Sequence, residues 1–97
     1  MVITIRSRTM NPGCVDSIML KLNHGFVPII KKQKGYVSYY VIDSGNDVVT
    51  AISVFENEAT SHASNKLAEA WVKENLGPLV PGSADIISGP VRVPSQG

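Results

Sequence analysis

The chain has 97 residues, a length that fits one domain with one core and excludes a second independent core. Hydrophobic residues make up 43% and charged residues 18%, below the share of about 25% usual in soluble domains, so a second copy of the chain is expected to cover part of the surface. Nine Lys and Arg against eight Asp and Glu leave a net charge of +1 without a basic run, which excludes a typical nucleic-acid-binding surface.

The first predicted element is a strand over 2–8, because its side chains alternate with a period of two. One side carries Val2, Thr4, Arg6 and Arg8, and the other carries Ile3, Ile5 and Ser7. The sequence leaves open which side faces the helices. The sequence Asn-Pro-Gly at 11–13 predicts a turn after this strand.

A helical pattern follows the turn. Hydrophobic side chains recur three and four residues apart on one face, at Val15, Ile18, Met19, Leu22, Phe26, Ile29 and Ile30. Pro28 removes an amide donor inside this pattern and collides with the carbonyl of His24, four residues back. We therefore expect a kink between Gly25 and Pro28, and the end of the helix by 34–35.

Two runs rich in β-branched and aromatic residues, 36–42 and 48–55, predict a β-hairpin. The connection 43–47 contains Asp, Gly and Asn, which tolerate positive φ angles. Both strands are apolar on both faces, so both faces of the sheet should be covered. The helices of so short a chain cover only one face. We therefore expect a homodimer in which the other face meets the sheet of the second subunit.

A second helix is predicted over 58–76, with Asn57 as its N-cap and a stop signal at 77–78. At about 100° per residue, one arc is expected to face the sheet. This arc holds Ala59, Thr60, Ala63, Ser64, Leu67, Ala70, Trp71 and Glu74. The side away from it is expected to be solvated and holds Ser61, His62, Asn65, Glu69 and Lys73.

The last strand is expected within 84–93, broken by Gly89 and Pro90, and 94–97 is expected to be a flexible tail. The predicted order of elements is βαββαβ. Two right-handed split βαβ units form a ferredoxin-like α+β sandwich, in which both helices pack on one face of a four-stranded antiparallel sheet. Residues 1–93 are thus expected to form a single domain.

Several segments carry a family resemblance that spans nearly the whole chain. They are Val-Pro-Ile-Ile at 27–30 leading into Lys-Gly-Tyr at 34–36, Val-Phe-Glu at 54–56, Ala-Ser-Asn at 63–65 and Ala-Trp-Val-Lys-Glu-Asn-Leu at 70–76. These segments resemble the antibiotic biosynthesis monooxygenase family of dimeric α/β barrels. The resemblance implies that two sheets close into a barrel and that each subunit holds a pocket between helices and sheet. The fold alone does not select a reaction.

Trp71 and Asn65 are the first two candidates for catalysis. Trp71 offers a flat surface on which an aromatic substrate can stack, and core packing is the alternative. Monooxygenases of the resembled family pair a helix asparagine with this tryptophan, and Asn65 is the match. The six-residue spacing, however, turns Asn65 about 120° away, toward solvent. With a different helix register, its amide would stabilise an enolate oxygen.

Arg92 and Glu74 complete the catalytic candidates. Arg92 resembles the arginine that family oxygenases hold near the substrate, and Arg6 and Arg8 are the alternatives if their side of the first strand faces the helices. Glu74, on the inward arc, either reaches water from the last helical turn or acts in the pocket as a base.

The candidate ligand-binding residues lie on the helices and the second strand. The hydroxyls of Thr60 and Ser64 either orient a ligand or bond back to their own helix backbone. Tyr39 and Tyr40 alternate in direction, so one faces the helices and the other packs in the dimer. Phe26 of the first helix completes this set.

The remaining reactive residues favour neither a metal nor another cofactor. His24 and His62 are predicted on outer helix faces, and no histidine follows Trp71, where haem-opening relatives carry their ligand. Haem binding or degradation is therefore the less favoured alternative. Cys14 is the only cysteine, which excludes an internal disulfide and fits the cytoplasm. No zinc spacing, nucleophile elbow or dinucleotide fingerprint occurs.

The favoured hypothesis is a cofactor-independent monooxygenase-like enzyme that acts on a small apolar or aromatic, polyketide-like molecule. The alternative is a non-catalytic ligand-binding or structural dimer of the same fold. The expected partners are a second copy of the chain and this small molecule. A membrane is not an expected partner, because no stretch reaches the roughly 18 apolar residues of a span. The first residues lack the pattern of a signal peptide, so a cytoplasmic location is expected.

Overall fold

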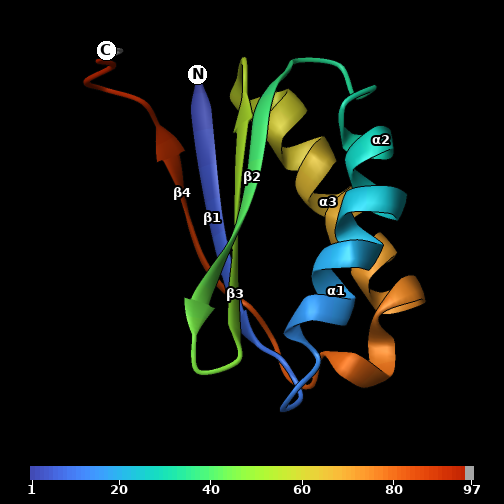
Figure 1. Ribbon diagram of the computed structural model, residues 1–97. Coiled ribbons are helices and arrows are strands. Elements are labelled where there is room, and N and C mark those ends of the chain that lie inside the picture. The colour runs from blue at the N-terminus through green and yellow to red at the C-terminus, as the bar shows by residue number, and fades with distance from the viewer. Residues whose placement is uncertain (96–97) are drawn as a thin grey trace.

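The computed structural model describes residues 1–95, which form a four-stranded antiparallel sheet with helices on one face (Figure 1). The inner strand β1 (Val2–Thr9) pairs with β3 (Val48–Phe55) on one side and with β4 (Asp85–Pro90) on the other, and β2 (Tyr36–Gly45) lies beyond β3. The order β2-β3-β1-β4 is that of two interleaved βαβ units. The predicted ferredoxin-like sandwich is thereby confirmed.

The helices form one layer beside the sheet (Figure 1). The first helical region consists of α1 (Val15–Lys21), the π-helix η1 (Leu22–Phe26) and α2 (Val27–Ile30), and the second consists of α3 (Glu58–Asn75) and the 3₁₀-helix η2 (Gly77–Leu79). The core between the two layers contains Met10, Ile18, Leu22, Phe26, Ile30, Val49, Phe55, Ala68, Leu76 and Val80. No helix within residues 1–95 combines the length and the hydropathy needed to cross a membrane.

The π-helix η1 stands where the sequence predicts a kink. The backbone N–H of Val27 donates to the carbonyl of Leu22, five residues back, which is the bond that defines a π turn. Pro28 has no amide hydrogen for the α-helical ladder, and this favours a change of helix type just before it. The predicted kink is thus realised as a wider turn, whose residues Leu22 and Phe26 are buried in the core.

Local hydrogen bonds explain where α3 begins and ends. The side-chain oxygen of Asn57 accepts a hydrogen bond from the backbone N–H of Thr60 at 2.9 Å, and the Thr60 hydroxyl accepts one from the N–H of Asn57 at 3.4 Å. This reciprocal pair is a capping box. At the other end Leu76 is the cap and Gly77 starts a 3₁₀ turn. The predicted helix therefore differs from α3 by one residue.

The β2–β3 connection is tighter than predicted. β2 continues to Gly45 and β3 begins at Val48, so that Asn46 and Asp47 alone form the turn, with φ angles of 53° and 62°. Positive φ at both residues matches the turn to the right-handed twist of the strands. Residues 43–45 of the predicted loop therefore belong to the strand.

Strand β4 is shorter than the predicted last strand. It ends at Pro90, after which the N–H of Val91 donates one last hydrogen bond to the carbonyl of Met1 at 2.9 Å, and Arg92 lies in an exposed bend beyond it. The expectation that Arg92 stands on the last strand is therefore wrong. Gln96 and Gly97 of the predicted tail lie outside the described residues.

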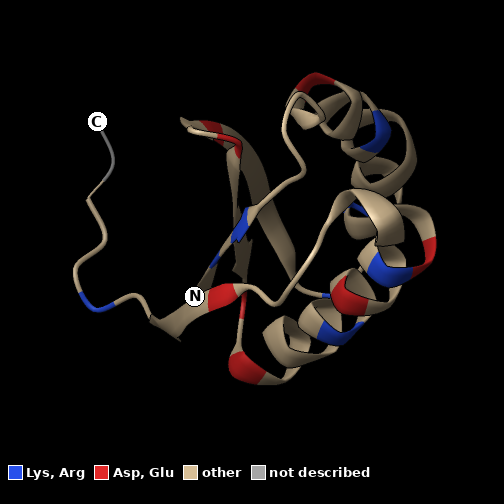
Figure 2. Ribbon diagram, turned by 90° about the horizontal axis from the view of Figure 1, so that it is seen from below, with Lys and Arg blue, Asp and Glu red and all other residues tan. Residues whose placement is uncertain are grey.

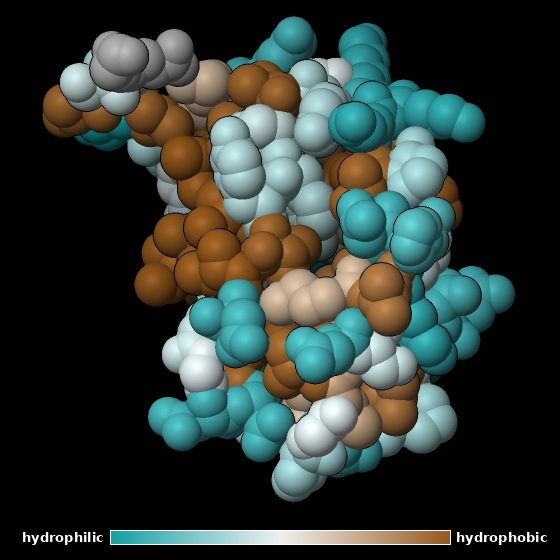
Figure 3. Space-filling model, viewed as in Figure 1, coloured by the Kyte–Doolittle hydropathy of each residue, from teal (hydrophilic) through white to brown (hydrophobic). Residues whose placement is uncertain are grey.

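The sheet face opposite the helices is uncovered in the single chain and is rich in hydrophobic side chains. Ile87 on β4 is 71% exposed and Tyr40 on β2 is 59% exposed. Ile5 and Ile52 lie in register with Ile87 across the two neighbouring strands. Figure 3 shows hydrophobic side chains gathered over β4 and beside it, whereas the charged residues lie mainly on the helical layer (Figure 2). The uncovered face therefore has the apolar character that the sequence predicts for β2 and β3.

Candidate functional site

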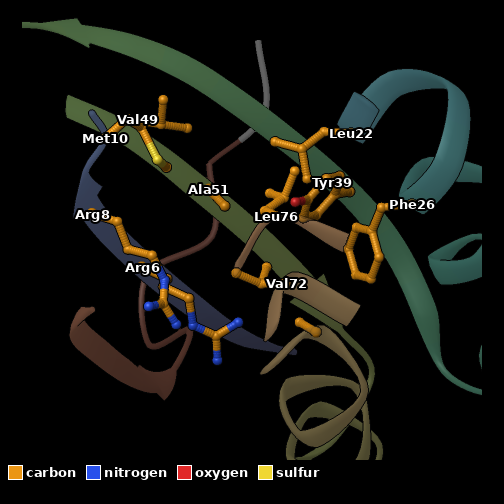
Figure 4. Close-up of a pocket in the computed structure, with 11 residues that line it drawn as sticks. Arg6, Arg8, Met10, Leu22, Phe26, Tyr39, Val49, Ala51, Val72 and Leu76 are labelled. Carbon is orange, nitrogen blue, oxygen red and sulfur yellow. The ribbon is translucent and has the colours of Figure 1, made fainter. Parts of the chain in front are cut away.

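A small cavity of about 50 Å³ lies between the helical layer and the sheet (Figure 4). Arg6 and Arg8 reach it from β1, and Tyr39 reaches it from β2. The rest of its wall is apolar and includes Met10, Leu22, Phe26, Val72 and Leu76. The cavity therefore places two guanidinium groups and one phenol inside an otherwise hydrophobic space.

Strand register brings the two arginines into this space. Arg6 lies opposite Ala51 of β3, and Arg8 lies opposite Val49. Ala51 on β3 and Ala68 on α3 both line the cavity, and their short side chains leave room beside the Arg6 guanidinium. The question that the sequence leaves open is thus answered, because the side of β1 that carries the arginines faces the helices.

Glu69 on α3 is the counter-ion of both arginines. Its Oε1 accepts a hydrogen bond from Arg8 Nη2 at 2.9 Å and lies 3.5 Å from Arg6 Nε. Arg8 Nη1 also donates to the carbonyl of Gly82 at 3.2 Å. The Arg6 and Arg8 side chains are only 12% and 11% exposed, against 49% for Glu69. Both Nε atoms are buried without a hydrogen-bond partner, so the contact of Arg6 with Glu69 is an ion pair only.

Burial is the main cause of the pKa changes of Arg6 and Tyr39. Burial lowers the pKa of Arg6, Glu69 opposes this change, and the positive charge of Arg8 adds to it. Burial also raises the pKa of Tyr39 to about 12, against the opposing effect of Arg6. An arginine keeps its proton in proteins, and a tyrosine with such a pKa is neutral at pH 7. The site thus combines fixed positive charge with a neutral hydroxyl donor.

A second cavity, of about 20 Å³, shares Arg6 and Tyr39 with the first and has a more polar wall. Asn65 of α3 lines it, and its Nδ2 donates a hydrogen bond to the Thr4 hydroxyl at 3.2 Å. The Thr4 hydroxyl also lies 3.3 Å from that of Ser61. This hydroxyl network holds the Asn65 amide at the cavity that the guanidinium and the phenol also line.

The face that α3 turns to the sheet differs from the predicted arc. Asn65 bonds to the sheet, so the expectation that it points to solvent is wrong. The buried residues Ser61, Ser64 and Ala68 define a face rotated from the predicted one. A helix in a two-layer sandwich contacts both the sheet and the neighbouring helix. Trp71, which the predicted arc places toward the sheet, packs against the first helical region instead.

Phe26 connects the aromatic side chains of the site. Its ring centroid lies 5.5 Å from that of Tyr39, edge to face, and 5.3 Å from that of Trp71. Phe26 lines the cavity, whereas Trp71 does not. The indole of Trp71 lies against Gly25 of η1 instead. Trp71 therefore supports the wall of the site through Phe26.

Three other predicted site residues lie away from both cavities. Glu74 is exposed near the end of α3, and Arg92 is exposed beyond β4. Tyr40, which follows Tyr39 on β2, is largely exposed and also stays outside both cavities. The predicted site residues that the structure gathers around the cavities are therefore Arg6, Arg8, Tyr39, Asn65, Ser64 and Phe26, of which Arg6 and Arg8 are only alternatives in the sequence.

The two predicted hydroxyl residues of α3 bond to their own helix. The Thr60 hydroxyl donates to the Asn57 carbonyl at 3.1 Å within the capping box. The Ser64 hydroxyl donates to the Ser61 carbonyl at 3.1 Å, although Ser64 also lines the smaller cavity. Such back-bonding satisfies these groups without a ligand.

A larger groove opens beside the cavity, between the first helical region and β2. Its volume is about 640 Å³, within the range of about 300–1,000 Å³ typical of small-molecule sites. Leu22 and Tyr39 line both the groove and the cavity, so these two side chains stand between them. Tyr36 and Tyr40 add aromatic walls to the groove.

The described residues offer little to a metal or to haem at this place. Residues 1–95 contain no group of three or more His, Cys, Asp or Glu side chains that could hold a metal ion. His24 and His62 are both exposed, and neither lines the cavities or the groove. An imidazole ligand for haem iron is therefore not positioned here.

Comparison with known proteins identifies the fold. No protein-family model and no curated protein matches the chain. A structure assigned to the antibiotic biosynthesis monooxygenases, from Deinococcus radiodurans, has a TM-score of 0.80 at 16% identity, covering 99% of this chain and 97% of that one. A monooxygenase from the gene ActVA-Orf6 of Streptomyces coelicolor, in complex with nanaomycin D, has a TM-score of 0.75 at 14% identity, covering 99% and 91%.

The haem degrader MhuD from Mycobacterium tuberculosis has a TM-score of 0.76 at 14% identity, covering 99% of this chain and 100% of that one. The resemblance to the antibiotic biosynthesis monooxygenases is thus confirmed at the level of the fold. Because proteins with this fold differ in activity, function has to be argued from the side chains of the site.

Proposed function

We propose that this protein, with its monooxygenase-type sandwich, binds a small aromatic molecule in the groove and cavity and oxygenates it without a metal or flavin. The observation that carries the proposal is the largely buried side chain of Arg6 beside the neutral phenol of Tyr39 in an apolar cavity. A fixed positive charge in a space shielded from water stabilises an oxyanion that develops on a substrate. Asn65 adds an amide donor from the smaller cavity.

The dimensions of the site support a division of the substrate into two parts. The groove of about 640 Å³ accommodates an aromatic body, whereas the cavity of about 50 Å³ admits only a small part of a ligand. The aromatic walls of Tyr36 and Tyr40 suit the flat body. The carbon to be oxygenated then lies near Tyr39, where groove and cavity meet.

The proposed chemistry uses the substrate as its own electron donor. An anthrone enters the site as its enolate, because its acidic methylene carbon loses a proton to a base in solution, and the negative charge then lies on the oxygen beside Arg6. The carbanion passes one electron to dioxygen, and the two radicals combine to a substrate peroxide. Loss of water leaves a carbonyl, so that CH₂ and O₂ become C=O and H₂O. Arg6 and Tyr39 lower the barrier by stabilising the oxyanion.

The alternative is a ligand-binding or structural dimer without catalysis. One observation favours it: of the candidate proton acceptors, Glu74 and the two histidines lie outside the cavity, and Tyr39, which lines it, is a neutral phenol at pH 7. Both functions use the same dimer, which we propose forms through the uncovered sheet face. The free thiol of Cys14 fits a reducing compartment, and we propose a cytoplasmic location on this ground.

Oxygen consumption with anthrone as substrate tests the enzymatic proposal. We expect Arg6→Met and Tyr39→Phe to lower the rate about 100- to 1,000-fold, as removal of one oxyanion donor does. Lys66→Met removes a positive charge from the exposed side of α3 and should leave the rate unchanged. Uptake at the wild-type rate in a folded Arg6→Met protein would refute the assigned role. Binding of anthrone without oxygen uptake would favour the non-catalytic alternative.

A further inference from the structure

The charges around the cavity are not balanced within the part of the chain that the structure describes. Arg6 and Arg8 carry two positive charges, and Glu69 is the carboxylate that contacts them. A buried polar group without a partner costs free energy, and two Nε–H donors remain unpaired here. The chain therefore maintains donor capacity and positive charge that residues 1–95 do not use. An incoming anion would satisfy both.

The cavity also lacks a base. Among the described residues that line the two cavities there is no Asp, Glu, His or Lys, and Tyr39 is neutral at pH 7. Proton removal inside the cavity consequently has no acceptor in its wall. A ligand that is already ionised when it enters the cavity needs no proton acceptor there.

Glu69 has room to leave the arginines. It lies half-exposed on the outer side of α3, beside a surface hollow of about 220 Å³ that it shares with Arg8 and Lys73. Lys73 stands one helical turn after Glu69 and lines the same hollow, so it is placed to accept the carboxylate as an i,i+4 partner. The side chain of Glu69 can therefore turn outward without losing ionic contact.

We propose that the ligand of this site is an aromatic oxyanion, a carboxylate or a phenolate, and that its charged group displaces Glu69 from Arg6 and Arg8. This inference rests on the proposed function, because it assigns a substrate class to the same cavity. Glu69 acts as the resident counter-ion of the empty site and moves into the outer hollow when the ligand binds. It thereby determines specificity, because a neutral ligand that leaves the two guanidiniums without a counter-ion cannot replace it.

Calorimetric titration with 2-naphthoate and with the neutral 2-naphthamide tests this inference. We expect wild-type protein to bind naphthoate more tightly, with an affinity that falls as salt rises. Glu69→Gln removes the competing carboxylate and should tighten naphthoate binding about fivefold, the scale of a part-exposed ion pair, without changing naphthamide binding. Glu56→Gln, which removes an exposed carboxylate outside the site, serves as the matched control.

The arginine side chains supply a second readout that does not depend on a variant. In ¹⁵N spectra, naphthoate should shift the Nε–H resonances of Arg6 and Arg8, and naphthamide should not. Equal affinity for both ligands with unmoved Arg resonances would overturn the role of Glu69 and leave the aromatic site of the proposed function standing. Failure of both compounds to bind would overturn the two proposals together. If Glu69→Gln does not fold, the comparison of naphthoate and naphthamide on the wild-type protein still tests the proposal.

Discussion

The backbone of Gly25 lies against the indole of Trp71, so closely that a Cβ added at residue 25 would stand 2.9 Å from Cζ2. Real Cβ atoms do not approach another atom to this distance, and the indole is held in turn by Phe26. The contact joins the π-helix η1 to α3 at the helix-to-helix side of the site.

Gly25→Ala should therefore destabilise the protein, although alanine is normally the better helix former. We expect a loss of about 1–2 kcal/mol in the free energy of unfolding, from overpacking against Trp71. Urea denaturation measures it. Gly77→Ala is the control, because a Cβ there meets no atom within 4 Å, and it should cost much less.

Gly35→Ala is expected to be more damaging, since two effects combine. Gly35 has a φ of +79°, and an added Cβ would lie 2.5 Å from the Thr60 hydroxyl, which belongs to the capping box of α3. Backbone strain of about 1–2 kcal/mol is then joined by a clash of similar size. Gly13 has the same φ in open space, so Gly13→Ala reports the strain alone. Equal losses in both variants would argue against the contact with Thr60.

The titration of Tyr39 predicts how stability changes at alkaline pH. Its pKa rises from 10.0 to about 12 on folding, so the folded state binds the proton more tightly than the unfolded chain. The contribution is complete below pH 10 and is lost as pH rises from 10 to about 12, at up to about 1.4 kcal/mol per pH unit. Chemical denaturation across this range should show a shallower decline for Tyr39→Phe. Tyr40→Phe should keep the wild-type slope.

If the dimer forms through the uncovered sheet face, a charge introduced on that face should disrupt it. Ile87→Asp places a carboxylate on that face, and we expect the dimer to dissociate into monomers, as measured by native mass spectrometry at micromolar concentration. Ile86 is the neighbouring residue of the same strand and points to the opposite side, so Ile86→Asp should leave the assembly intact. A wild-type monomer would contradict the proposed interface.

Periodicity predicts the elements of this chain well because each carries a local signal. The capping box at Asn57 and Thr60, the missing amide of Pro28 and the turn residues Asn46 and Asp47 act over a few residues only. Local signals do not determine where every element ends. Nothing in a turn motif reveals that β2 continues to Gly45 before the chain reverses.

The site depends on information that one sequence does not carry. The alternation of side chains along β1 predicts that Arg6 and Arg8 lie on the same face of the strand. Only the pairing with β3 and the position of α3 show that this face is the one toward the helices. Asn65 is misplaced because Trp71 suggests the wrong face of α3. Glu69 reaches both arginines from a position that the helix pattern assigns to solvent. Its contact with two arginines on one strand is a tertiary property.

The π-helix η1 also determines how the first helical region is aligned over the sheet. Four buried residues of the first helical region follow one another at intervals of four positions: Ile18, Leu22, Phe26 and Ile30. In a continuous α-helix each such step overshoots a full turn by about 40°, so three steps would carry the last side chain about 120° around the axis. The wider turn of η1 rotates less per residue and takes back part of this drift. Converting η1 to α-helical winding at unchanged length would add this rotation back and swing Phe26 and Ile30 around the helix axis together.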